Sequence, residues 1–228
     1  MEDYGNFLQE GELSNIAIAE LPDAVKYVRI DNPKARLLAD YALHKSDLEF
    51  VIEVLKEINL TSSSTAKEAL WQIAIVKFIK CFVGSSARIA LDAKVVFAGK
   101  DGALEVFRYF KSLRDKHFVH DENSYTQVAV AAALNDGGKA FKVEKIVALA
   151  AHGVTLDQDN YANLSLATND SLKWVREKFD LLANSITTAL EKLSFDELNC
   201  LPEISVGVPD IKDIDKRRSS ISSKSLQT

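Results

Sequence analysis

The segment 113–121, LRDKHFVHD, concentrates side chains that can transfer protons and bind phosphate. It places two of the four histidines, His117 and His120, beside Arg114 and two carboxylates. Histidine titrates near neutral pH, and arginine binds phosphate through a planar fork of N–H donors. These residue types, so close together, favour acid–base chemistry next to a bound anion.

Motifs of several other enzyme classes are absent. The chain has no G-x-x-x-x-G-K-[ST] phosphate loop, no H-E-x-x-H, no C-x-x-C and no G-x-S-x-G. We therefore expect no cofactor and no metal. One alternative is a metal site formed by His117, His120 and Asp121, whose spacing can present ligands together. Another is that Arg114 and His120 have a structural role, as salt bridges or caps near a helix C-terminus.

Composition indicates a globular, mainly helical chain that forms a single domain over residues 1–202. Hydrophobic residues make up 47% of the 228, enough for a sizeable core. No proline occurs between Pro33 and Pro202, which favours long helices. The net charge of −5 conceals a basic block, because residues 61–120 carry ten basic and five acidic side chains. This block is either a phosphate-binding surface or a solvated helix face.

The helices that position the segment are indicated by caps and apolar spacing. Asn32 and Pro33 predict a helix start, with a helix over 34–44 that either restarts at a capping box, Ser46–Glu49, or continues to Ile58. A second capping box at Thr65–Glu68 begins a helix to about Phe82. The remaining predictions before the segment are a helix over 87–97, a turn at 99–102 and a helix over 103–120.

Beyond this segment the period changes from helical to alternating. Val128, Val130, Ala132 and Leu134 alternate, and so do Phe141, Val143, Lys145 and Val147. Asn135–Gly138 offers residues that accept positive φ in a tight turn. The pattern predicts a β-hairpin over about 125–149, although the alanine run 129–133 also favours helix.

The C-terminal part begins with an apolar seam from Leu172 to Leu193, spaced for packing against another helix or in a dimer. A capping box at Ser194–Glu197 opens a short helix that ends before Pro202. Few large apolar residues follow, so residues 203–228 are predicted to form a disordered tail.

The spacing R-D-K-H-F-V-H, with five residues between Arg114 and His120, resembles the signature of the higher-eukaryote-and-prokaryote nucleotide-binding (HEPN) superfamily, in particular its abortive-infection-like branch. The resemblance covers about residues 34–195. It implies an antiparallel helical bundle, usually a homodimer with two motifs across a cleft. Active members of the superfamily are metal-independent endoribonucleases in toxin–antitoxin, phage-defence and RNA-processing systems, and others are binding or assembly modules.

Under this resemblance each candidate residue has a role in RNA cleavage. His120 is the general base or acid, Arg114 is the cation that stabilises charge on phosphate, and Asp115 orients Arg114 or the imidazole. His117 and Lys116 assist electrostatically, and the predicted substrate-binding residues are Lys116, Lys111 and Arg108. An ideal helix places Arg114 and His120 about 120° apart, so either the helix distorts or two chains converge. His44 and His152 are expected to be ordinary surface or core histidines.

The predicted function is thus metal-independent RNA cleavage, with a non-catalytic HEPN-like dimerisation or interaction module as the alternative. The expected partners are RNA, a second copy of the chain and an antitoxin or regulatory protein. No signal peptide or transmembrane helix is predicted, and Cys81 and Cys200 are expected to be thiols, so we expect no membrane association and a cytoplasmic location.

Overall fold

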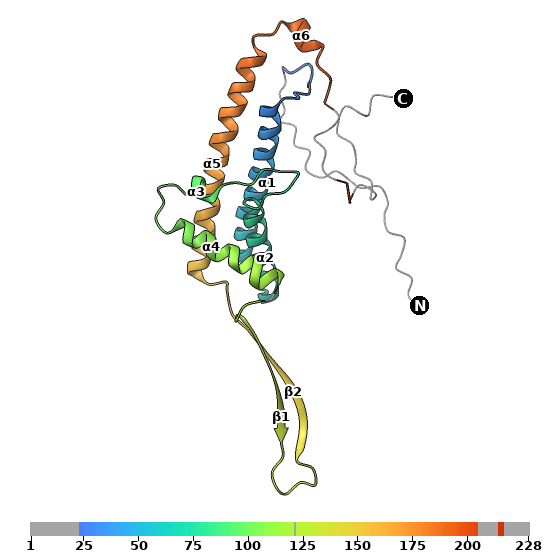
Figure 1. Cartoon of the computed structure of the whole chain (residues 1–228), viewed down its shortest axis with the longest axis vertical. Helices are drawn as coiled ribbons and strands as arrows, with labels where there is room; N and C mark the ends of the chain where they lie inside the picture. The colour runs from blue at the N-terminus through green and yellow to red at the C-terminus, as the bar shows by residue number, and fades with distance from the viewer. Residues whose placement is uncertain (1–22, 121, 205–213, 217–228) are drawn as a thin grey trace, which may run out of the picture. The chain divides into compact units, whose positions relative to one another are not determined.

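The computed structural model describes residues 23–120, 122–204 and 214–216 (Figure 1). They fall into two compact units. The first unit comprises the described residues of Met1–Asp40, Ser86–Ile89 and Phe179–Thr228, and the second comprises Tyr41–Ser85 and Ala90–Lys178. The described chain is mainly helical and contains a two-stranded antiparallel sheet, as predicted.

The elements in chain order are seven helical segments and two strands within the described residues. They are α1 (Pro33–Leu60), α2 (Ser64–Lys80), α3 (Ala93–Val96), α4 (Ala103–Leu113), a π-helix η1 (Arg114–Val119), β1 (Thr126–Leu134), β2 (Val143–His152), α5 (Gln158–Leu190) and α6 (Phe195–Asn199). Residues of α1 and α5 belong to both units.

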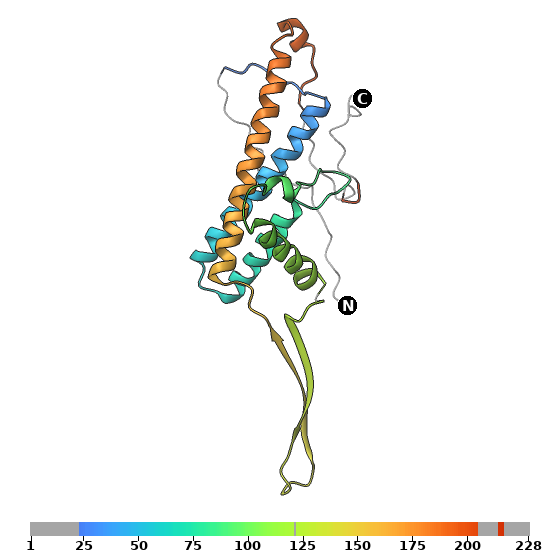
Figure 2. The same ribbon diagram turned by 60° about the vertical axis from the view of Figure 1, so that its left-hand side comes forward.

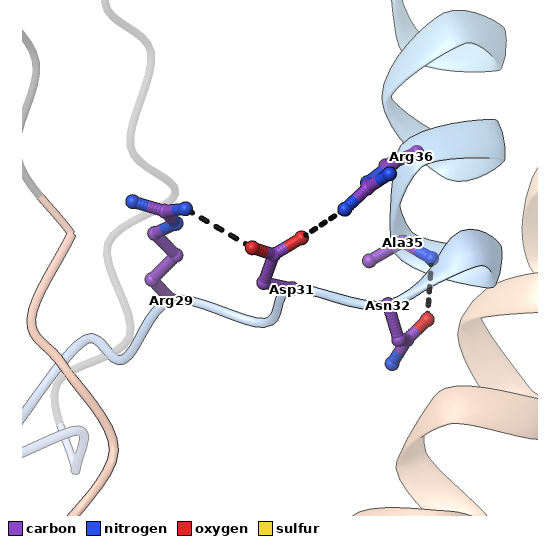
Figure 3. Close-up of polar contacts among 5 residues, drawn as sticks. All are labelled: Arg29, Asp31, Asn32, Ala35 and Arg36. Atoms are coloured by element: carbon purple, nitrogen blue, oxygen red, sulfur yellow. Dashed lines mark hydrogen bonds and ion pairs between the residues drawn. The ribbon is translucent and has the colours of Figure 1, made fainter. Parts of the chain in front are cut away.

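The predicted cap at the start of α1 is confirmed. Asn32 accepts a hydrogen bond at Oδ1 from the backbone N–H of Ala35, 2.8 Å away (Figure 3). Just before it, Asp31 accepts from Arg36 at 3.0 Å and from Arg29 at 3.3 Å. The hydrogen bond and charge of Arg36, with a smaller contribution from Arg29, lower the pKa of Asp31. These side chains satisfy one of the free amides and order the segment that enters the helix.

The predicted helices before α4 are present with some changes. Helix α1 continues unbroken through Ser46, which was one of the two predicted alternatives, and ends at Leu60 instead of Ile58. Helix α2 begins earlier than Thr65, because the extended residue Ser63 is the cap and accepts from the N–H of Ala66 at 3.2 Å. The predicted helix over 87–97 is wrong except at α3.

The reason lies in the backbone between α2 and α3. The N–H of Leu91 donates to the carbonyl of Cys81 at 2.9 Å, so it does not join a helical ladder. The side chain of Asp92 then accepts from the N–H of Lys94 at 2.8 Å and caps α3. A tertiary hydrogen bond thus replaces the local helical one.

The core of the second unit is apolar and draws on α1, α2, α4 and α5. Its most buried side chains include Leu48, Val51, Leu55, Trp71, Ile75, Phe78, Ile79, Phe110, Leu113, Leu164 and Val175. Trp71 of α2 packs edge-to-face on Phe110 of α4, with ring centroids 6.0 Å apart. Burial of these side chains provides the main favourable term in folding of this unit.

Helices α1 and α5 run antiparallel within the second unit. Near the start of this part of α1, the ring of Tyr41 meets Trp174 with centroids 5.9 Å apart. Near the end of α1, the carbonyl of Leu55 and the side chain of Asn59 bond to the hydroxyl of Tyr161 at 2.8 and 2.7 Å. Contacts that advance along one helix and retreat along the other define the antiparallel arrangement.

The predicted β-hairpin is present. Strands β1 and β2 pair from Thr126↔His152 to Leu134↔Val143, with an irregularity at Ala133/Leu134, and form a twisted ribbon (Figures 1 and 2). The alanine run 129–133 is strand, not helix. Of the four residues Asn135–Gly138 that were expected to supply positive φ, the two glycines do not have it. Among the described glycines only Gly99 and Gly102 do, in the turn before α4.

The C-terminal helix is longer than its apolar seam predicts. Asp157 accepts from the N–H of Asn160 at 2.8 Å, so α5 begins at Gln158. The capping box of Ser194 and Glu197 is confirmed at α6. The predicted tail 203–228 lies outside the described residues except for 203–204 and 214–216.

Two further predictions concern the cysteines and the membrane spans. Cys81 is buried and Cys200 is exposed, and neither forms a disulfide. In the described ranges, no helix combines the length and the apolar character needed to cross a bilayer.

Candidate functional site at the end of α4

The candidate segment forms a π-helix. Helix α4 ends at Leu113 and passes directly into η1, Arg114–Val119, and His120 follows as the C-terminal flanking residue. A π-helix bonds each N–H to the carbonyl five residues back, and such turns recur at functional sites. The single helix predicted over 103–120 is therefore wrong beyond Leu113. The helix is therefore distorted over the segment that joins Arg114 to His120.

Asp115 holds two cations of the segment. Its carboxylate accepts from Arg114 Nη1 at 2.5 Å and from Lys111 Nζ at 2.5 Å. Partial burial acts to raise the pKa of Asp115, but the hydrogen bonds and charges of Lys111 and Arg114 outweigh it and lower that pKa. Asp115 is therefore ionised at neutral pH and orients Arg114.

Arg114 is only partly accessible. Its side chain is 30% exposed. Its Nε is buried and has no hydrogen-bond partner. An anion that reached this guanidinium could use donors that Asp115 does not occupy, because arginine has five N–H groups in a fixed fork.

The predicted substrate-binding residues lie on the surface. Arg108 and Lys111 are exposed on α4, three residues apart, so they share one face of the helix. Lys116 is exposed on η1. Arg108 and Lys111 could contact neighbouring phosphates of a nucleic-acid strand. The ammonium group of Lys111, however, already binds Asp115.

Other lysines of the basic block are neutralised within the second unit. Lys77 and Lys80 lie 3.0 and 3.3 Å from the carboxylate of Asp47. Lys100 forms an ion pair with Asp170. The excess of basic residues in 61–120 is thus compensated in part by acids from elsewhere in the chain.

A pocket of about 490 Å³ opens beside η1. The lining residues come from α2, η1, the base of the hairpin and the turn that follows it. They are Glu68, Gln72, His117, Phe118, Thr126, His152, Gly153 and Val154.

This pocket brings two histidines together. His117 was predicted as a site residue, and His152, expected to be an ordinary surface or core histidine, is exposed and lines the same pocket. His152 is the last residue of β2 and pairs with Thr126, which places it at the base of the hairpin. No local pattern around His152 reveals this, because the strand register alone determines it.

Tyr125, the residue before β1, contacts both His117 of η1 and Gly153, the residue after β2. Its ring lies 5.5 Å from the ring of His117, centroid to centroid. On its other side, Gly153 donates its N–H to the Tyr125 carbonyl at 2.6 Å. The Nδ1 of His117 is buried without a hydrogen-bond partner. His117 is thus held by ring contacts, and its Nδ1 makes no hydrogen bond to the protein.

A polar network supports the pocket from the side of α5. The buried indole N–H of Trp71 donates to the hydroxyl of Thr155 at 3.0 Å. Asn160 donates to the Thr155 carbonyl at 3.0 Å and to Asp157 at 2.7 Å. These bonds tie the turn after β2 to α2 and to the start of α5.

Tyr109 joins this network. Its hydroxyl accepts from Asn160 at 3.2 Å. Burial, followed by a hydrogen bond with Tyr125, raises the pKa of Tyr109 to about 12. The phenol is therefore neutral at physiological pH and has a structural role beside the pocket.

His120 lies apart from these contacts. It is exposed at the end of η1 and does not line the pocket. Among the described residues, no hydrogen bond or ion pair joins it to Arg114. The structure therefore groups Arg114 with Asp115 and Lys111, and His117 with His152, and leaves His120 at the surface.

The alternative of a metal site gains no support. Within 23–120, 122–204 and 214–216, no group of three or more His, Cys, Asp or Glu is placed to hold an ion. Asp121, one of the three suggested ligands, lies outside the described residues. His44, which was expected to be an ordinary surface or core histidine, is fully buried on α1.

Comparison with protein-family models, with curated proteins and with solved structures gives no match to this chain.

Proposed function

We propose that this chain is a metal-independent endoribonuclease of the HEPN type, which acts as a homodimer in a toxin or phage-defence system. The observation that carries the proposal is η1. The π-helix occupies Arg114–Val119, which is the whole of the segment that resembles the HEPN motif except its last residue, His120. A departure from α-helical geometry at a chemically rich segment favours a functional role over a purely structural one.

The segment has the groups that this reaction needs. One imidazole would remove the proton from the ribose 2′-hydroxyl, which attacks the phosphorus, while another would protonate the leaving 5′-oxygen. His120 and His117 are the first candidates, because both belong to the motif. Arg114 would stabilise the charge on the phosphate, with Asp115 holding its guanidinium in place.

The surface around the segment suits a polyanion. Arg108, Lys111 and Lys116 are exposed on α4 and η1 and would bind the RNA backbone. The pocket next to His117 is large enough to hold part of a nucleotide, since small-molecule sites start at roughly 300 Å³. Binding through so few phosphates would weaken as salt concentration rises.

A second candidate is a non-catalytic HEPN-like dimerisation or interaction module. The contacts of Asp115 favour it, because they bind Arg114 and Lys111 within the protein. In that case Arg114 would stabilise the end of α4, and its replacement would lower stability without affecting any reaction.

Cleavage of total RNA in EDTA distinguishes the two candidates. Wild type and the variants His120→Ala and Arg114→Ala are compared at equal concentration, after circular dichroism has shown that each is folded. The ribonuclease proposal expects cleavage by wild type that falls by about 10²-fold or more in His120→Ala. Thr188→Ala, at an exposed position of α5, is the matched control and should cleave like wild type.

Two results would contradict the proposal. Equal cleavage by wild type and His120→Ala would assign the activity to another site or to a contaminant. Absence of cleavage, together with a lower melting temperature of Arg114→Ala, would favour the interaction module.

A further inference from the structure

The hairpin exposes an apolar surface that the described residues do not cover. Residues that pair across β1 and β2 have their side chains on the same face. One face, which we call the aliphatic face, contains Val128, Val130, Leu134, Val143 and Ile146 together with Ala132, Ala148 and Ala150. Its five large side chains are between 45% and 75% exposed.

The opposite face differs in size and polarity. This alanine face has three alanines along β1, at 129, 131 and 133, and Val147 and Leu149 on β2. Gln127 and Lys145 interrupt it near its two ends. The aliphatic face is therefore the bulkier of the two. The register continues it at its base with Thr126 and His152, and near the tip Glu144, unpaired at the irregularity, lies two residues from Ile146.

A two-stranded hairpin with one apolar face left open is marginal in water. Single exposed apolar residues are ordinary on protein surfaces, but contiguous patches of this kind mark interaction sites. The aliphatic face is thus a candidate interaction surface, and its pattern of side chains indicates the partner.

We propose that the aliphatic face docks on the aliphatic face of a second copy of this chain. Large and small side chains lie opposite one another across the strands: Val128 faces Ala150, Val130 faces Ala148, and Ile146 faces Ala132. Each of these three large side chains therefore stands beside a hollow over an alanine, whereas Leu134 and Val143 face each other. In a two-fold stack of two such faces, the large residues of one copy fill the hollows of the other.

The area agrees with a modest dimer. Five large aliphatic side chains, each offering roughly 60–100 Å², and the alanines between them present about 500 Å² of apolar surface per copy. Two copies would bury about 1,000 Å² in total, which is the lower limit for a specific interface. We therefore expect an association that depends on protein concentration.

Charge argues for this occupant over a nucleic acid or a bilayer. The aliphatic face offers no cations to phosphates. At the tip of the hairpin, Lys139 and Glu144 pair at 3.1 Å, with Asp136 and Lys142 nearby in the chain. Charges at the tip would oppose entry into hydrocarbon, whereas a polar rim around an apolar centre is usual for protein interfaces.

Two lysine substitutions on the same strand test the inference. Ile146 and Leu149 are both 60% exposed, but they lie on opposite faces of the hairpin. The full chain is analysed by sedimentation over a range of concentrations, as wild type, Ile146→Lys and Leu149→Lys. Wild type should dimerise, Ile146→Lys should raise the dimer dissociation constant by about tenfold or more, and Leu149→Lys should leave it unchanged. Val130→Lys should repeat the effect of Ile146→Lys.

The outcomes are separable from loss of folding or of activity. Circular dichroism shows whether each variant keeps its helices. A wild type that stays monomeric at every concentration overturns the inference, as do equal effects of Ile146→Lys and Leu149→Lys or flotation of wild type with lipid vesicles. The inference does not need ribonuclease activity. A monomeric wild type that cleaves RNA would refute both this interface and the homodimer of the proposed function, and would leave the catalytic residues as proposed.

Discussion

Gly153 lies so close to the Tyr125 ring that any side chain in its place would force the ring or the backbone to shift. A Cβ added at Gly153 would come within 2.7 Å of Cδ1 of the Tyr125 ring, below any normal contact distance. The same ring packs against His117, and Gly153 and His117 both line the pocket. The position of the candidate site therefore depends on a glycine that takes no part in its chemistry.

Gly153→Ala should consequently destabilise the protein and disturb the pocket. Either the Tyr125 ring or the turn after β2 must move, and overpacking of this kind costs about 1–3 kcal/mol. Urea unfolding followed by circular dichroism measures the loss. Gly137→Ala is the matched control, because nothing lies within 4 Å of a Cβ there. Equal stability of the two variants would show that Tyr125 adjusts freely.

Thr155→Val should weaken the attachment of the turn after β2 to α2. Both Thr155 and Trp71 are buried, and the substitution leaves the indole N–H of Trp71 without its acceptor. An unsatisfied buried donor costs about 1–3 kcal/mol. Unfolding in urea, followed by tryptophan fluorescence, measures the change, with exposed Thr188→Val as control and an expected change below about 0.5 kcal/mol. A loss no larger than that of the control would contradict the role of this bond.

Asp115→Asn should lower stability at neutral pH but not in acid. The pKa of Asp115 is lowered in the folded protein, so its stabilising contribution is present above the unfolded pKa, about 3.9, and disappears as pH falls through the lower folded pKa. The difference between wild type and variant should be about 1 kcal/mol at pH 7, since the pair is partly exposed.

Melting temperatures from pH 7 down to pH 3 measure that difference. The gap between wild type and Asp115→Asn should narrow below about pH 4. Asp180→Asn, at an exposed position of α5, serves as control. A gap that stays constant across this range would show that the ion pairs do not cause it.

His117→Ala and His152→Ala should each reduce RNA cleavage if the shared pocket is part of the catalytic site. The expected loss is about 10²-fold for a residue that transfers a proton, and the double variant should lose little more than either single one. The measurement is cleavage of total RNA in EDTA, with His120→Ala alongside. Wild-type cleavage by His152→Ala would confine the reaction to residues of the motif.

The sequence determined those features that neighbouring residues decide. The cap at Asn32, the capping box of Ser194 and Glu197 and the alternation that forms β1 and β2 were all predictable, because each rests on contacts within a few residues. Asp115 beside Arg114 could likewise be expected to orient it. The resemblance to the HEPN motif, and with it the function, stays a prediction.

The tertiary structure decided the rest. The helix expected over 87–97 is reduced to α3, because the backbone of Leu91 bonds to Cys81. No side-chain pattern in residues 114–119 distinguishes a π-helix from an α-helix, so only the backbone hydrogen bonds reveal it. His117 and His152 share a pocket because the register of the hairpin pairs His152, at the end of β2, with Thr126, at the start of β1. Such pairings join residues far apart in sequence, and they follow from packing and hydrogen bonding across the fold rather than from any local pattern.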